Sequence, residues 1–323
     1  MSMNPTAPLF NHIVAFEVSK AELVVHTLPA DRQERIPNTA ARVRRILLRE
    51  QRANTRLGSG PMLVLCEATG GYEHHVLEQA HELNLNLHRA HGSSTRLFAR
   101  LVGHKAKTDQ IDAAMLAHYG RTQSLALYHP PSPHQQALRA LRRRHDDMTT
   151  MLRMELNRTE QARSAAIKTS LHRHCRWLQT ERDALQAQID TLIAQSAELE
   201  GKASLIQSIK GVGPKTAAAV LAYLPEIGTI TKAQAAGLAG LAPYANDSGS
   251  AQGKRHIAGG RSPLRASLYM AALVARYRNP KLRAFGLNLK ARGKPNKLVL
   301  TAIMRKLIVI INAVIASGQP ART

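Results

Sequence analysis

The sequence predicts an α/β domain at the amino end, a helical middle segment and a mainly α-helical carboxyl-terminal domain. Three observations lead to this fold class. Strand-like and helix-like segments alternate over the first 120 residues, apolar residues recur at three- and four-residue spacing in the middle, and Ala- and Gly-rich helical segments follow residue 201. The chain has 323 residues, enough for about two domains, and its 44% hydrophobic content argues against global disorder.

We place the α/β domain at residues 1–127. Apolar runs predict four strands, of which the first two are close enough to form a hairpin; they span residues 12–18, 22–28, 61–66 and 85–91. The helical spacing of apolar residues predicts helices at 39–52, 72–83 and 108–119. Thr108 is the expected N-cap of the last helix, because its hydroxyl can accept a hydrogen bond from an unpaired backbone N–H group.

Residues 128–200 begin with a Pro-rich hinge at 128–133, after which a long helical stretch is expected. Ser132 is the predicted N-cap and Pro133 the predicted first helical residue. Two apolar seams follow, separated by a basic, less periodic segment at 171–177. The seam residues are Leu138, Leu141, His145, Met148, Leu152, Leu185, Ile189, Leu192 and Leu199. This pattern predicts a helical hairpin or coiled coil, and an ordinary two-helix bundle fits it equally well.

Residues 201–323 form the predicted carboxyl-terminal domain. Residues 205–224 predict a helix, a Gly-Val-Gly turn and a second helix, and further helices are expected at 263–277 and 296–316, with a loop at 243–262. The most apolar tract, 298–316, is interrupted by Arg305 and Lys306, so we interpret it as a buried helix and expect no membrane span. The amino end does not have the pattern of a signal peptide.

The net charge and the two cysteines indicate the kind of partner and the cellular location to expect. The net charge is +23, and residues 201–323 carry 19 Lys and Arg residues against Glu226 and Asp247. Because so large an excess causes self-repulsion, we expect a polyanionic partner, and nucleic acid is the leading candidate. Cys66 and Cys175 cannot form a disulfide scaffold or a structural zinc site, which indicates a reducing, cytoplasmic location.

Four acidic residues are candidate metal ligands. Glu17 lies within the first apolar strand, Glu67 directly follows the third, and Asp109 and Asp112 lie in the first turn of a predicted helix. Clustered carboxylates repel each other unless a cation neutralises them, and oxygen ligands suit Mg²⁺ or Mn²⁺. Asp109 alone is equally explained as an acid that the helix dipole favours.

Two basic segments are candidate nucleic-acid contacts. The turn Lys210-Gly211-Val212-Gly213-Pro214-Lys215 resembles a helix-hairpin-helix motif, whose backbone N–H groups suit a phosphate oxygen. A tight helix–helix turn that requires glycine is the alternative. The second segment, 240–265, contains the candidate nucleophile Ser248 with Ser250 as the second choice, and the candidate phosphate ligands Lys254, Arg255, Arg261 and Arg265. Serine attack on phosphorus would leave a phosphoserine, although Ser-Gly pairs are also common in ordinary loops.

In combination these motifs resemble the Piv/MooV-type DNA invertases and insertion-sequence transposases, which pair an amino-terminal DEDD domain with a carboxyl-terminal serine domain. The matching segments are VAFEVSK (14–20), CEATGGYE (66–73), KTDQIDAAMLA (107–117), IKGVGPKTA (209–217) and GLAPYANDSGSAQGKRHIAGGR (240–261). The resemblance implies a RuvC-like, RNase H-type fold for the first domain. It also implies that Glu17, Glu67, Asp109 and Asp112 occupy the metal-site positions and that Ser248 is the nucleophile.

The resemblance further implies a bacterial, nucleoid-associated protein that acts on donor and target DNA as a homo-oligomer, a dimer or tetramer. Some members of the family are guided by a structured non-coding RNA. One departure is clear, since the first acid of the family is usually aspartate and here it is Glu17. We therefore expect a DNA transposase or site-specific recombinase. The alternatives are a metal-dependent endonuclease of the Holliday-junction type and a non-catalytic nucleic-acid-binding protein.

Overall fold

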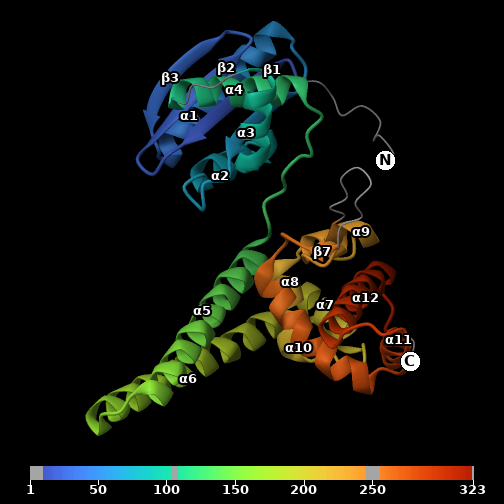
Figure 1. The fold of residues 1–323 in the computed structure, drawn as a ribbon. Coiled ribbons are helices and arrows are strands. Elements are labelled where there is room, and N and C mark those ends of the chain that lie inside the picture. The colour runs from blue at the N-terminus through green and yellow to red at the C-terminus, as the bar shows by residue number, and fades with distance from the viewer. Residues whose placement is uncertain (1–9, 104–107, 245–254, 322–323) are drawn as a thin grey trace. The chain divides into compact units, whose positions relative to one another are not determined.

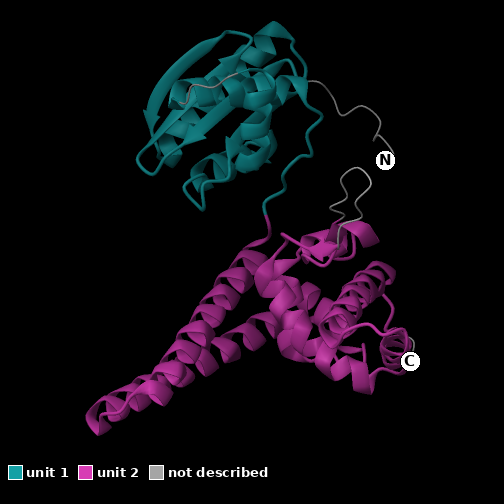
Figure 2. Cartoon of the chain, in the orientation of Figure 1, with its two compact units in different colours: residues 1–130 teal, residues 131–323 magenta. Residues whose placement is uncertain are grey.

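The computed structural model describes residues 10–103, 108–244 and 255–321. The chain divides into two compact units, unit 1 at residues 1–130 and unit 2 at residues 131–323 (Figure 2). The division falls inside the Pro-rich segment 128–133, where consecutive prolines disfavour regular secondary structure.

Unit 1 contains a five-stranded mixed sheet with the strand order β3-β2-β1-β4-β5 (Figure 1). The strands are β1 (His12–Val18), β2 (Glu22–Leu28), β3 (Arg32–Pro37), β4 (Met62–Glu67) and β5 (Asn86–Ala90). The first three strands are antiparallel neighbours, whereas β4 pairs in parallel with both β1 and β5. This mixed α/β arrangement confirms the predicted fold class and is consistent with an RNase H-like domain.

Helices cover both faces of the sheet. They are α1 (Ala40–Leu57), α2 (His74–Glu82), α3 (Gly92–Leu101) and α4 (Asp109–Thr122). α1 and α2 pack on the face to which Val14 and Phe16 point, and α4 packs on the face of Ile13 and Ala15 (Figure 1). The predicted N-cap of α4 is confirmed, because the Thr108 hydroxyl accepts a hydrogen bond of 3.2 Å from the Ile111 backbone N–H group.

Two elements of unit 1 were missed by the sequence analysis. β3 was missed because its sequence, RQERIP, is polar, with only Ile36 buried. It is nevertheless a strand because β2 offers it a free edge and pairs with it along its length. α3 was missed because it has a single buried residue, Phe98.

Unit 2 is helical apart from a short two-stranded hairpin. Its elements are α5 (Pro133–Gln161), α6 (Ala165–Gln195), α7 (Ala197–Gln207), α8 (Pro214–Tyr223), α9 (Lys232–Leu238), β6 (Pro243–Tyr244), β7 (His256–Ile257), α10 (Ser262–Arg278), α11 (Pro280–Ala291) and α12 (Asn296–Ser317). α5 and α6 pair as a long hairpin that extends from the other helices of the unit (Figure 1). Ser132 caps α5 and Pro133 is its first residue, as predicted.

The basic segment that separates the two apolar seams is itself helical. Residues 171–177 lie inside α6, and the chain turns between the two helices at 162–164. The segment stays helical because Cys175 and Leu178 are buried against Met148 and Leu152 of α5. Apolar residues on one face are sufficient to hold this basic stretch in a helix.

The core of unit 2 forms around α12. Within the described residues α12 is the one helix long and apolar enough to cross a membrane, but half of its most apolar window is buried inside the protein. Ile303, Leu307 and Ile311 are fully buried among residues of α7, α8 and α10. The interpretation of this tract as a buried helix therefore agrees with its packing. α9 and α11, which are short, were missed.

Candidate active site and nucleic-acid interface

Two of the four candidate acids lie side by side on the sheet. The parallel register pairs Phe16 with Cys66, so Glu17 and Glu67 are the next residues on neighbouring strands. Strand alternation places both side chains on the face covered by α4, since Ile13 and Leu65, at positions of the same parity, contact that helix. Two carboxylates so placed repel each other unless a cation lies between them.

α4 presents the other two acids to the same face. Its buried residues are Ala113, Leu116, Ala117 and Gly120. Asp109 and Asp112 precede Ala113 and Leu116 by four residues, so they continue this stripe by one turn towards the amino end of the helix. All four acids are therefore carried by the α4 side of the sheet, at the carboxyl ends of β1 and β4 and the first turn of α4.

The carboxylate of Glu67 is confined by the start of α3. A Cβ atom placed on Gly92 would lie 2.1 Å from Glu67 Oε1 and 3.3 Å from Arg96 Nη2. The Thr95 hydroxyl donates a hydrogen bond of 3.3 Å to Glu67 Oε2. A larger residue at position 92 would therefore displace the Glu67 carboxylate. We call Glu17, Glu67, Gly92 and Thr95 together the acid edge.

A buried glutamate that the sequence analysis missed organises the loop after Glu67. Glu73 is 1% exposed, and its carboxylate accepts hydrogen bonds from the backbone N–H groups of Thr69 (3.2 Å) and Gly71 (2.8 Å) and from Arg89 Nε (3.0 Å). Burial raises the pKa of this carboxyl, but the hydrogen bonds from backbone N–H groups, Thr69 and Arg89 outweigh it and lower the pKa to about 2. The signal in the sequence was a second acid six residues after Glu67.

The acid edge has the donor chemistry of a hard-cation site. Its ligands are carboxylate oxygens, which suit Mg²⁺ or Mn²⁺. Within the described residues, however, no three His, Cys, Asp or Glu side chains gather closely enough to hold a metal ion. The structure therefore brings Glu17 and Glu67 together in register and places Asp109 and Asp112 on the same side, without closing the four into one ligand set. The neighbouring Cys66 lies on the opposite face of the sheet, fully buried in the apolar cluster under α1 and α2, where burial raises the pKa of its thiol.

The glycine turn of unit 2 lies between α7 and α8, as predicted. Gly211 has a φ of 97°, and a Cβ atom there would lie 2.5 Å from the Ala275 Cα of α10, so this glycine is needed for packing. Gly213 precedes α8 with open space beside its Cα, and Lys210 and Lys215 are exposed. The half of the turn at Gly213 therefore has room for a phosphate oxygen, whereas Gly211 is filled by α10.

The candidate serine loop connects the strands of a short hairpin. β6 and β7 pair through Pro243–Ile257 and Tyr244–His256, and the loop's candidate residues Ser248, Ser250 and Lys254 lie outside the described residues. The backbones cross closely next to this hairpin, because a Cβ atom on Gly260 would lie 2.1 Å from the Gly240 backbone nitrogen. The two ends of the loop are therefore held together by contacts that only glycine permits.

Two arginines predicted to contact nucleic acid also hold this hairpin in place. Arg261 forms a two-pronged ion pair with Glu226, with both N–O distances 2.7 Å, and donates to the Tyr223 carbonyl. Burial raises the pKa of Glu226, but the hydrogen bonds and charge of Arg261 outweigh it and lower the pKa. Arg265 donates to the Gly259 carbonyl at 2.8 Å and to the Gly240 carbonyl at 3.3 Å. Arg255 is exposed.

Comparison with known proteins finds transposase family models that match residues in both units. Residues 18–163 match the DEDD transposase model of the IS110 type, and residues 203–286 match the model described as the transposase IS116/IS110/IS902 family. The chain is 31% identical over 265 residues to the pilin gene-inverting protein of Moraxella lacunata, a match that covers 80% of this chain and 81% of that protein. The pilin gene-inverting protein of Moraxella bovis matches to the same extent.

The chain belongs to the IS110 family of transposases. An uncharacterised protein of insertion element IS110 from Streptomyces coelicolor is also similar, at 32% identity over 141 residues, which is 43% of this chain and 34% of that protein. Membership of a family of insertion-sequence transposases and DNA invertases implies DNA as the substrate and its cleavage and rejoining as the reaction. The DEDD-type domain also implies dependence on a divalent metal ion.

Proposed function

We propose that this IS110-family protein is the transposase of an insertion sequence, and that it cuts and rejoins DNA through a serine nucleophile and a divalent-metal acidic site. The observation that carries the proposal is the placement of Glu17 and Glu67 side by side on the sheet face that α4 covers with Asp109 and Asp112. Adjacent carboxylates repel each other, and a divalent cation held between them would offset that repulsion.

The nucleophile we propose is Ser248, with Ser250 as the second choice. Its Oγ forms a bond to the phosphorus of a phosphodiester, the bond from phosphorus to one bridging oxygen breaks, and that oxygen leaves as a free hydroxyl. The serine proton passes to a base and the leaving oxygen takes up a proton, so the step is balanced without an external energy source. Attack by a DNA hydroxyl on the phosphoserine reverses the step and rejoins the strand.

Glu17, Glu67, Asp109 and Asp112 are the residues that would hold the divalent ion. When bound, such an ion stabilises the negative charge that develops on the phosphate oxygens. Thr95 and Gly92 orient Glu67, because one donates to its carboxylate and the other leaves the space that it fills. In this proposal Arg255 and Lys254 face the phosphate, and Lys210, Lys215 and the backbone at Gly213 contact DNA beside the cut.

The proposal requires the acids of unit 1 and the serine of unit 2 to reach one phosphodiester. They would do so within one chain or between the chains of a homo-oligomer, either a dimer or a tetramer. A structured guide RNA is a further partner, which the family resemblance and the high positive charge of residues 201–323 support.

The test is a covalent trapping assay on DNA that carries the ends of the element, in the presence of Mg²⁺ or Mn²⁺. The wild-type protein should form a denaturation-resistant adduct, and Ser248→Ala and Glu67→Gln should not. Mixing these two inactive variants restores the adduct only if serine and acids come from different chains. Metal-dependent cleavage without any adduct would indicate a nuclease that uses water, and would refute the serine mechanism.

A further inference from the structure

A groove lined by arginines runs along α1 on the opposite side of the sheet from the acid edge. It has a volume of about 970 Å³, and its walls come from α1 and β3. We call it the arginine groove; its charged lining residues are Glu34, Arg42, Arg44, Arg45, Arg49, Arg52 and Arg56. α1 packs through Val43, Ile46 and Leu47 on the sheet face opposite to the one that α4 covers.

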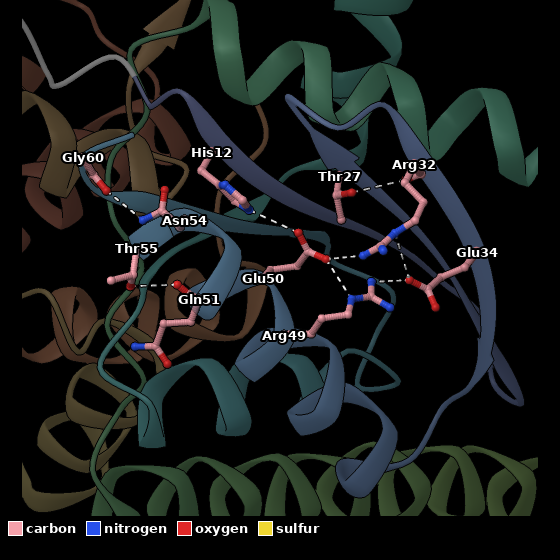
Figure 3. A network of polar contacts seen from close by, with 10 residues as sticks. All are labelled: His12, Thr27, Arg32, Glu34, Arg49, Glu50, Gln51, Asn54, Thr55 and Gly60. Carbon is pink, nitrogen blue, oxygen red and sulfur yellow. Dashed lines mark hydrogen bonds and ion pairs between the residues drawn. The ribbon is translucent and has the colours of Figure 1, made fainter. Parts of the chain in front are cut away.

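Arg49, which lines the arginine groove, belongs to an ion-pair network around a buried carboxylate (Figure 3). Glu50 is 2% exposed, and its carboxylate contacts His12 Nε2 at 3.2 Å, Arg49 Nε at 2.9 Å and the guanidinium of Arg32. Arg49 also binds Glu34 on β3. Arg44, which also lines the groove, pairs with Glu82 of α2 at 2.9 Å. These contacts hold α1 rigidly against the sheet.

Four arginines of the groove are left without internal partners. Arg42, Arg45, Arg52 and Arg56 are exposed, and among the described residues none of them forms a hydrogen bond or ion pair. With Arg49 they recur at spacings of three, four, three and four residues, so all five lie in one row along the helix. The four unpaired guanidinium groups in this row repel one another and favour an extended anion.

We propose that the arginine groove binds the phosphodiester backbone of a nucleic acid. Guanidinium groups match phosphate oxygens in a two-pronged geometry. The fourteen-residue step from Arg42 to Arg56 spans about 21 Å, the length of roughly six base pairs of duplex. Six of the twelve residues that line the groove are arginines and only Glu34 is acidic, so the charge of the lining favours an anionic occupant.

The location gives this contact a role separate from cleavage. The acid edge and the arginine groove lie on opposite faces of one sheet, so the segment in the groove is not the one being cut. The groove therefore holds a second segment, either flanking DNA or RNA. Both share the phosphodiester backbone that the groove recognises, and the experiment distinguishes them.

The experiment measures binding by the full-length protein to labelled duplex DNA and to labelled single-stranded RNA, in metal-free buffer so that cleavage plays no part. The test variant is Arg45→Gln/Arg52→Gln. The control is Arg100→Gln/Arg121→Gln, which removes the same charge from exposed sites on α3 and α4. The test variant loses two positive charges, so its plot of log affinity against log salt concentration should become less steep for the nucleic acid that occupies the groove. The expected change in slope is about 1.8 if that is duplex DNA and about 1.4 if it is single-stranded RNA. The control should retain the wild-type slope.

A second measurement locates the contact. A thiol introduced by Ala41→Cys, in the wall of the groove, should be protected from alkylation by the same nucleic acid; Cys66 and Cys175 are buried and do not interfere. An unchanged slope in the test variant, or an equal fall in the control, overturns the proposal. Protection by poly-glutamate but by neither nucleic acid would show a protein-docking surface and would also overturn it. None of these outcomes bears on the serine mechanism.

Discussion

The acid edge and the arginine groove occupy opposite faces of one sheet and carry opposite charges. Each is held in place by a buried glutamate that binds arginine. Next to the acid edge the buried Glu73 is held by Arg89 and backbone N–H groups, and beneath the groove the buried Glu50 is held by Arg32, Arg49 and His12. The difference lies in the charge that each face carries: exposed arginines on one face, adjacent carboxylates on the other. A buried carboxylate with arginine partners can thus hold either an acidic or a basic surface in place.

The largest effect should come from removing the charge of Glu50. Glu50→Gln removes the buried carboxylate that Arg32 and Arg49 share. Because both arginines are partly exposed and still contact Glu34, the cost should be about 3 kcal/mol, the lower end for breaking a buried pair. We expect the free energy of unfolding of unit 1 to fall by that amount in urea titrations. The matched control is Glu82→Gln, which breaks the exposed pair with Arg44 and should cost less than about 1 kcal/mol. Equal losses in the two variants would contradict the anchoring role of Glu50.

Glu73 should make the stability of unit 1 depend on pH. Because folding lowers its pKa to about 2, the carboxylate stabilises the fold above its unfolded pKa of about 4.3, by roughly 3 kcal/mol. This contribution is lost as the pH falls from about 4.3 towards 2. The stability difference between wild type and Glu73→Gln should therefore shrink over this range. If the difference stayed constant between pH 7 and pH 3, the carboxylate would not be the stabilising form.

Gly92→Ala should show whether the position of the Glu67 carboxylate matters for DNA cleavage independently of the stability of the fold. The added Cβ atom displaces the Glu67 carboxylate, and a misplacement of about 1 Å costs about 10²-fold in rate. We expect DNA cleavage to fall by about this factor while the melting temperature stays near the wild-type value. Gly201→Ala, at a helical glycine with open space around it, should cleave normally. If Gly92→Ala cleaved DNA at the normal rate, Glu67 would not be part of the active site.

The smallest effect concerns the hairpin that carries the serine loop. Arg261→Lys keeps the charge but loses the two-pronged pairing with Glu226, which is partly exposed and therefore worth about 1 kcal/mol. Recombination should fall several-fold with little change in DNA affinity. Arg255→Lys, at an exposed residue, is the control for stability. A loss of DNA affinity equal to the loss of activity in Arg261→Lys would show that Arg261 contacts DNA directly.

Much of the fold could be predicted from the sequence because the decisive patterns are local. The apolar strands β1, β2 and β4, the cap of α4 and the start of α5 at Pro133 follow from alternation, spacing and capping. The polar strand β3 could not be predicted, because it exists through pairing with β2, which is a tertiary contact. The turn at 162–164 could not be located from the sequence, because the basic segment 171–177 is helical through its packing on α5, which is a tertiary contact.

The acidic residues of the candidate site could be predicted from the sequence, but the residues that hold them in position could not. Glu17 and Glu67 were recognised because each carboxylate interrupts or ends an apolar run. Gly92 and Glu73 were not, since the close approach of one and the backbone hydrogen bonds of the other appear only in three dimensions. The arginines at positions 42, 45, 49, 52 and 56 are visible in the sequence, but the groove that they line beside β3 forms only when α1 packs on the sheet.

The most direct test of the central claim is whether DNA becomes covalently attached to the protein through Ser248 in a reaction that needs the acid edge. Peptide mapping of the trapped adduct should find the nucleotide on Ser248 in wild type and no adduct in Glu67→Gln. An adduct that persists in Ser248→Ala, or that forms fully in Glu67→Gln, would contradict the account.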